Sequence, residues 1–147
     1  MPRRCTIAIE ISPVAEPQVE TQLIDEKTKK RLDAARQFSI DAARLAAQTH
    51  CNNIVVLDVS AISPITDFLI IATGTSARQM RSVCDEIEEM GAPHNFTALS
   101  KPGYESEHWV LVDFVDAILH VFNTEARLFY DLENLWGDGK KVEWREV

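Results

Sequence analysis

Apolar residues recur at three- and four-residue steps between Arg31 and His50, the spacing that places them on one face of an α-helix. Charged residues such as Asp33 and Arg36 lie elsewhere around the helical wheel. The pattern therefore predicts an amphipathic helix over 31–50. Its apolar face consists of Leu32, Ala35, Phe38, Ala42, Leu45, Ala46 and Thr49.

Two short runs that are apolar at almost every position follow, at Ile54–Val59 and Asp67–Thr73. Such runs are typical of strands buried on both faces. Ser76 and Gln79 then have the S-x-x-Q spacing of a capping box, which predicts the start of a helix. Gly91 marks its end. The apolar stripe of this helix consists of Met80, Val83, Ile87 and Met90.

The apolar segments Trp109–Asp113 and Ala117–Phe122 are separated by only three residues. That gap is too short for a crossover helix, so the two segments are expected to pair as an antiparallel hairpin. A weaker strand is predicted at Phe96–Ser100. Thr124 is expected to cap a final helix that ends before Gly137. The apolar residues of that helix are Leu128, Phe129, Leu132, Leu135 and Trp136.

The order of these elements predicts an α/β fold with a mixed β-sheet of about five strands flanked by helices. Helix crossovers favour parallel neighbours, whereas the hairpin adds an antiparallel pair. The folded domain is placed at 31–137, with a C-terminal tail at 138–147. Residues 1–30 show no sustained period and are interpreted as a flexible N-terminal extension, with a short strand at Thr6–Ile11 as the alternative.

Charge is concentrated in one part of the chain. The 147 residues include 15 Lys and Arg against 23 Asp and Glu, a net charge of −8. Residues 51–136 alone hold four basic and thirteen acidic residues. This excess of acid argues against direct nucleic-acid readout and against a polybasic membrane anchor, and it favours a basic protein as partner.

Signals for location are few. No stretch approaches 18 consecutive apolar residues, and Glu10 interrupts the short apolar run near the start, so no membrane span or secretory leader is expected. Cys5, Cys51 and Cys84 are widely spaced and form no metal-binding or redox motif. We interpret them as free thiols in a reducing compartment, which predicts a cytoplasmic protein.

No catalytic set can be assembled from the sequence. The Gly74–Ser76 segment joins a strand to a helix N-terminus, where an anion can bind, but no Walker lysine follows it. A nucleotidyltransferase would need closely placed Asp residues for a divalent metal, and the nearest candidates, Asp113 and Asp116, lie across a turn. His120 lies mid-strand among apolar residues, which favours a satisfied histidine over a general base. We therefore expect no metal, no cofactor and no catalytic residue.

Aromatic residues gather late in the chain, between Trp109 and Trp136. Exposed beside Asp113, Asp131 or Glu133, some of them would form an aromatic patch rimmed by acid, which suits a protein partner. Core packing is the alternative for each of them. The aromatic residues between the two tryptophans are Phe114, Phe122, Phe129 and Tyr130.

Several motifs in the same order resemble the Iojap-type ribosomal silencing factors. Trp109–Phe114 is similar to the W-V-L-L-D-Y stretch of that family, and His120–Phe122 to its H-V-F. Arg127 with Tyr130–Trp136 is similar to R-x-x-Y-D-L-E-x-L-W. The resemblance runs from about residue 31 to 137 and includes the earlier segments Asn53–Ser60, Ser63–Phe68 and Ala72–Gln79.

The resemblance implies a non-enzymatic protein with a nucleotidyltransferase-like fold that lacks the metal-binding acids. Such proteins bind large-subunit ribosomal protein fourteen on the large ribosomal subunit, block association with the small subunit and so repress translation, and they commonly form homodimers. Two other functions stay open: a large-subunit assembly factor, as for organellar relatives, and a nucleotide-binding enzyme. The residues expected to contact the partner are Trp109, Asp113, Phe114, Tyr130, Leu132 and Glu133.

Two motifs depart from the family pattern. Pro102-Gly103 stands where the family usually has Glu-Gly, and Asp113-Phe114-Val115-Asp116 stands where it has D-Y-G-D. Valine tolerates positive φ poorly, so the hairpin turn is not expected to be type I′. Both changes lie in loops near the expected docking face.

Overall fold

The computed structural model describes residues 17–146. Its contacts divide the chain into two units, Met1–Asp33 and Ala34–Val147, and the long helix α1, Pro17–Gln48, crosses that boundary. The helix begins at Pro17 and not at Arg31 as predicted. Its first turns are rich in Gln, Glu and Lys, which favour helix. Residues 25–31 are all exposed and polar, so the apolar stripe that predicted the helix does not extend toward Pro17.

Two further points concern the start of the chain. Pro17 occupies the first position of α1, which suits proline because the amide it lacks has no partner within the helix. The short strand considered at Thr6–Ile11 lies outside the described residues.

A mixed five-stranded sheet in the order β3-β4-β2-β1-β5 forms the centre of the second unit, which confirms the predicted fold class. Only β2 and β4 pair in parallel, and the other neighbours are antiparallel, including the predicted β3–β4 hairpin. The connection from β1 to β2 contains no helix, which allows their antiparallel pairing. The strands are β1 (Asn52–Asp58), β2 (Phe68–Thr73), β3 (Trp109–Asp113), β4 (Ala117–Phe122) and β5 (Lys140–Lys141).

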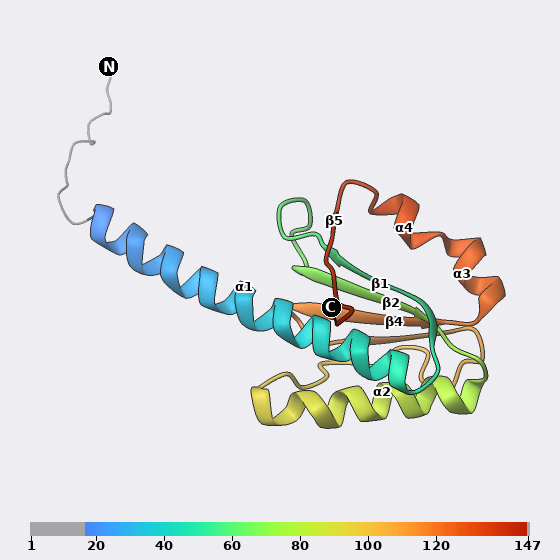
Figure 1. Cartoon of the computed structure of the whole chain (residues 1–147). Coiled ribbons are helices and arrows are strands. Elements are labelled where there is room, and N and C mark those ends of the chain that lie inside the picture. Colours follow the sequence, from blue (N-terminus) through green and yellow to red (C-terminus); the bar gives the residue numbers. More distant parts are fainter. Residues whose placement is uncertain (1–16, 147) are drawn as a thin grey trace, which may run out of the picture. The chain divides into compact units, whose positions relative to one another are not determined.

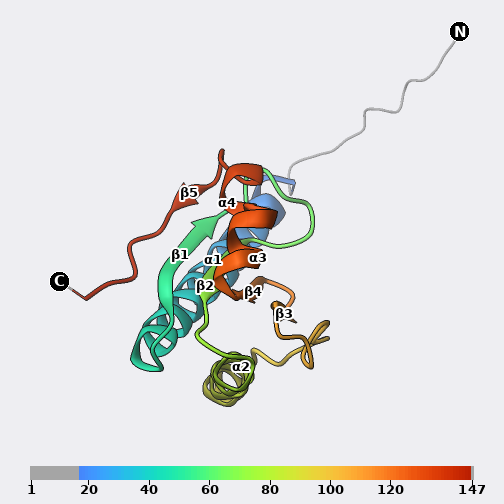
Figure 2. The same ribbon diagram turned by 90° about the vertical axis from the view of Figure 1, so that its right-hand side faces the viewer.

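Helices cover both faces of this sheet (Figures 1 and 2). Helix α2 (Ala77–Gly91), its short extension η2 (Ala92–His94) and the part of α1 from Ala34 onward lie on one face. Helices α3 (Thr124–Tyr130) and α4 (Leu132–Leu135) lie on the other. The first face is fully buried, and its large core side chains include Phe38, Phe68, Ile70, Met80, Ile87 and Leu119.

Two predicted elements were wrong. Phe96–Ser100 is not a strand, because the Phe96 ring turns inward and stacks on Phe38 with centroids 4.4 Å apart, and only Ser100 forms an isolated bridge, to Asp113. The final helix is not continuous, because Asp131 adopts φ 46° and separates α3 from α4. Its N-cap is Asn123, whose side chain accepts from the Ala126 amide, and not Thr124.

The β3–β4 turn contains a single positive φ, at Val115 (74°), and type I′ needs two, so it is not type I′, as predicted. Val115 nevertheless adopts a positive φ, the conformation that valine tolerates poorly. The Phe114 carbonyl accepts from the Asp116 amide at 3.0 Å, which closes a three-residue turn centred on Val115.

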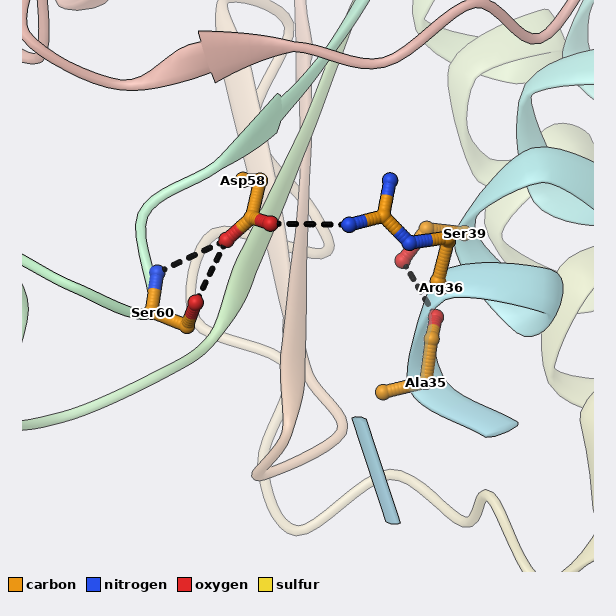
Figure 3. Close-up of polar contacts among 5 residues, drawn as sticks. All are labelled: Ala35, Arg36, Ser39, Asp58 and Ser60. Atoms are coloured by element: carbon orange, nitrogen blue, oxygen red, sulfur yellow. Dashed lines mark hydrogen bonds and ion pairs between the residues drawn. The ribbon is translucent and has the colours of Figure 1, made fainter. Parts of the chain in front are cut away.

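An ion pair ties α1 to the end of β1 (Figure 3). The Arg36 guanidinium donates to Asp58 Oδ2 at 2.9 Å, while the Ser60 amide and hydroxyl donate to Oδ1 at 3.0 and 2.6 Å. Partial burial raises the pKa of Asp58, but the hydrogen bonds from Ser60 and the charge of Arg36 outweigh it and hold the pKa below its usual value. Asp58 is thus a structural carboxylate within this layer.

Candidate functional site

Strand β3 alternates between a buried and a half-exposed face. Val110 and Val112 are fully buried, whereas Trp109, Leu111 and Asp113 are only partly covered. In the pairing with β4, Trp109 lies opposite Phe122 and Asp113 opposite Ile118. Because alternate residues share a face, one side of this hairpin belongs to the core beneath α1 and α2, and the other belongs to the side of α3 and α4.

An aromatic cluster occupies the half-exposed side. The Trp109 ring lies 4.6 Å from Tyr130 and 5.0 Å from Phe122, measured between centroids. Trp109 Nε1 donates to His120 Nδ1 at 3.1 Å. Burial lowers the pKa of His120 to about 4, so the imidazole is neutral and can accept this bond at neutral pH. His120 is therefore a satisfied histidine that orients Trp109, as the sequence favoured.

A buried arginine fixes α3 and α4 to the sheet. Arg127 Nε and Nη2 donate to the two carboxylate oxygens of Glu133 at 2.8 and 3.0 Å, and Nη1 donates to Thr73 Oγ1 at 2.8 Å. The hydrogen bonds from Arg127 lower the pKa of Glu133 more than its partial burial raises it. One guanidinium thus joins α3, α4 and the end of β2, and holds Tyr130 next to Trp109.

Helices α3 and α4 are too short to cover their side of the sheet completely. Trp109, Ile118 and Leu132 pack on a buried cluster that includes Phe122 and Ile71 but remain partly exposed themselves. We call the half-covered residues of this side the open face: Trp109, Leu111, Asp113, Ile118, Tyr130 and Leu132.

Helices α3 and α4 expose large apolar side chains toward solvent. Leu128, Phe129 and Leu135 are 76%, 81% and 71% exposed, and we call these three residues the helical ridge. Two exposed acidic residues are near them along the chain, Glu125 before Leu128 and Asp131 between Phe129 and Leu135. Large apolar side chains exposed in this way favour a protein-binding surface.

The six predicted contact residues have different fates. Trp109, Tyr130 and Leu132 come together on the open face, and Asp113 lies at the other end of β3 on the same face. Phe114 is only 3% exposed, and its ring packs edge-on against Phe38 in the opposite layer. Its selection as a surface residue was wrong, because one step along a strand reverses the direction of the side chain.

Glu133 is placed differently from the expectation as well. Both its carboxylate oxygens are taken by Arg127, so its position supports the helices more than it rims the surface. The sequence reasoning did not select Leu111, Ile118 or the helical ridge. Strand alternation from Trp109 could have indicated Leu111, but no sequence signal marks Leu128 and Phe129 as uncovered, because core packing uses the same residue types.

The chemical alternatives find no support among the described residues. Within residues 17–146, no three His, Cys, Asp or Glu side chains are grouped to hold a metal ion. The capping box is confirmed in its main contact, Gln79 N donating to Ser76 Oγ at 3.1 Å, so the start of α2 is satisfied by its own chain. Burial raises the pKa of Cys51, and raises that of Cys84 to about 12, which leaves both as inert thiols.

Comparison with known proteins agrees with these features. The sequence model described as "RsfS: Ribosomal silencing factor during starvation" matches residues 32–147. The chain belongs to this family. It is 37% identical over 94 residues to a "Ribosomal silencing factor RsfS" of Halalkalibacterium halodurans, a match covering 64% of this chain and 80% of that protein.

A plant relative and a solved structure extend the likeness and confirm the Iojap-type resemblance. The chain is 28% identical over 106 residues to "Protein Iojap, chloroplastic" of Zea mays, covering 72% of this chain and 46% of that one. A crystal structure from Chromobacterium violaceum superposes with a TM-score of 0.65 at 28% identity, covering 79% of this chain and 93% of that chain.

The departure at Pro102-Gly103 lies along the outer edge of β3. The Pro102 carbonyl accepts from the Leu111 amide at 3.0 Å, so this loop covers the outer edge of β3. Gly103 adopts φ 75°, and a Cβ there would lie 2.4 Å from the Trp109 carbonyl. The glycine of the family motif is therefore required by the close approach to Trp109.

No described helix is both long and apolar enough to cross a membrane.

Proposed function

We propose that this protein silences ribosomes by binding large-subunit ribosomal protein fourteen on the large ribosomal subunit, where its bulk blocks the approach of the small subunit and so represses translation. Membership of the ribosomal silencing factor family supports the general function. The observation that carries the mechanism is the open face with its helical ridge, an uncovered aromatic and apolar surface within the acidic part of the chain.

Charge and apolar contact have separate roles in this proposal. The acidic residues of 51–136 attract a basic ribosomal protein and speed the encounter, an effect that salt screens. Trp109 and Tyr130 supply a rigid aromatic centre, the residue type on which binding energy concentrates. Asp113 is expected to provide a charged contact at the far end of β3. Because the block is steric, no catalytic residue is needed.

Density-gradient fractionation of ribosomes tests the proposal. Purified wild-type protein added to a mixture of subunits should shift joined ribosomes to free subunits and travel with the large subunit. Tyr130→Ala should weaken this effect about tenfold or more, because it removes an aromatic side chain from the centre of the open face. The matched control is Tyr104→Ala, since Tyr104 lies on the other side and bonds Asp85 of α2.

Each outcome separates the candidate functions. Protein that travels with large subunits yet leaves joined ribosomes intact would support the assembly-factor alternative and contradict silencing by exclusion. Protein that binds no ribosomal particle would contradict both. Sedimentation analysis of the free protein would test the expected homodimer, and the proposed function implies a location in the cytoplasm with the ribosomes.

A further inference from the structure

Val115 holds a backbone conformation that valine rarely adopts. Its φ is 74°, in the left-handed region that favours glycine, and its branched Cβ makes that region especially costly. The surrounding chain enforces the conformation. Asp113 Oδ1 accepts from the Val115 amide at 2.8 Å, and the Asp116 carbonyl accepts from the Asp67 and Phe68 amides at 3.1 and 3.2 Å. Strain of this kind persists only where neighbouring contacts fix it.

The side chain of Val115 is only partly covered by the rest of the protein. It is 53% exposed, whereas its neighbour Phe114 is 3% exposed. Glycine or asparagine would occupy the same backbone at lower cost. A strained position whose apolar side chain stays half exposed favours a use of that side chain outside the molecule.

The position of Val115 joins it to the open face. The side chain of Asp113, an open-face residue, accepts from the Val115 amide, so Val115 is held next to the end of β3. The bonds from Asp67 and Phe68 to Asp116 bring the loop after β1 to the same end of the sheet. That loop contains two further exposed apolar residues, Ile62 and Ile65, which are 44% and 75% exposed.

We propose that Val115 is a specificity-determining contact of the open face, and that its isopropyl group packs against an apolar site on the basic ribosomal protein that the face binds. This inference rests on the proposed function. The strain at Val115 is the cost in stability of presenting a branched apolar group where a glycine would leave only backbone. The same substitution should therefore change folding stability and binding in opposite directions.

The test measures thermal unfolding and affinity for isolated large subunits on the same variants. Val115→Gly should raise the melting temperature by about 3 °C, because the strain is relieved, and weaken binding about fivefold, because the apolar group is lost. Val115→Ala should weaken binding to a similar extent with a smaller gain in stability, since a Cβ remains. His50→Gly is the control, since His50 is exposed with φ 72° in the layer of α1 and should gain stability with unchanged affinity.

The outcomes distinguish this inference from the function on which it rests. Equal affinities of the wild-type protein and Val115→Gly for large subunits would overturn the inference and leave the proposed function standing. Val115→Gly with an unchanged or lower melting temperature would overturn the strain argument. A wild-type protein that does not bind large subunits would overturn the proposed function and the inference together.

Discussion

The two faces of the β3–β4 hairpin differ in how far they are covered. On the closed side, which faces α1 and α2, Val110 and Val112 are completely buried. On the open side, Trp109 and Leu111 are only half covered, because α3 and α4 have seven and four residues. The side of the sheet under α1 and α2 is therefore fully covered. Part of the apolar side under α3 and α4 stays exposed, where a partner can cover it.

Both layers combine aromatic packing with an ion pair, but the two ion pairs differ in burial. On the closed side, the Phe38 ring packs between Phe96 and Phe114, and Arg36, which is 45% exposed, pairs with Asp58. On the open side, Arg127 is only 8% exposed, and its ion pair with Glu133 holds two helices too short to be stable alone. Breaking an ion pair costs more where its charge lies buried.

The largest effect is expected from removing one aromatic ring on the closed side. Phe38→Ala should lower the free energy of unfolding by about 4 kcal/mol, because it leaves a cavity beside Phe96 and Phe114. The same change on the open side, Phe129→Ala, should alter it by less than about 0.5 kcal/mol, since that ring is 81% exposed. Urea denaturation measures both, and equal losses would mean that the two sides do not differ as described.

A smaller effect is expected from removing the arginine that holds α3 and α4. Arg127→Met should cost about 3 kcal/mol in urea denaturation, since it leaves the buried Thr73 hydroxyl and the partly exposed Glu133 carboxylate without their partner. Arg36→Met is the matched control, because Arg36 forms an ion pair with Asp58 but is 45% exposed and should cost under about 1 kcal/mol. Similar costs for the two variants would contradict the role given to Arg127.

Acid should lower the free energy of unfolding through His120, which lies on the open side. Its pKa in the folded state is about 4, lower than the ordinary value of 6.5, so the unfolded chain takes up a proton first as pH falls. Stability is therefore complete above pH 6.5 and declines toward pH 4, with a loss of about 2 kcal/mol at pH 5.

The control for this pH dependence is His120→Gln, whose side-chain oxygen can still accept from Trp109 Nε1 but cannot titrate. The difference between wild type and variant isolates His120 from the carboxylates, which both proteins share. Parallel pH profiles for the two proteins would show that His120 is not buried in its neutral form.

Much of the fold followed from local apolar patterns, since Trp109–Asp113, Ala117–Phe122 and the helix after Ser76 were predicted close to their observed bounds. The start of α1 was missed because residues 25–31 are exposed and polar, so no apolar stripe extends the predicted helix toward Pro17. The break at Asp131 was missed because a single left-handed residue leaves the apolar spacing unchanged on both sides of it.

The role of the candidate site stays a prediction. The structure brings the rings of Trp109 and Tyr130 together on one surface, but their contact with a partner is untested. Phe114 was misplaced because its direction depends on strand alternation through the turn. The ion pair between Arg127 and Glu133 could not be predicted, since it depends on the turn between α3 and α4.

Hydroxyl-radical footprinting of the protein bound to isolated large subunits tests the central claim most directly, because it reports side-chain exposure without any substitution. The account predicts that Phe129, Tyr130 and Leu135 lose reactivity on binding, while Met90 and Tyr104, on the side of α2, keep theirs. Protection of Met90 and Tyr104 with no change at Phe129 and Tyr130 would contradict the claim that the open face is the docking surface.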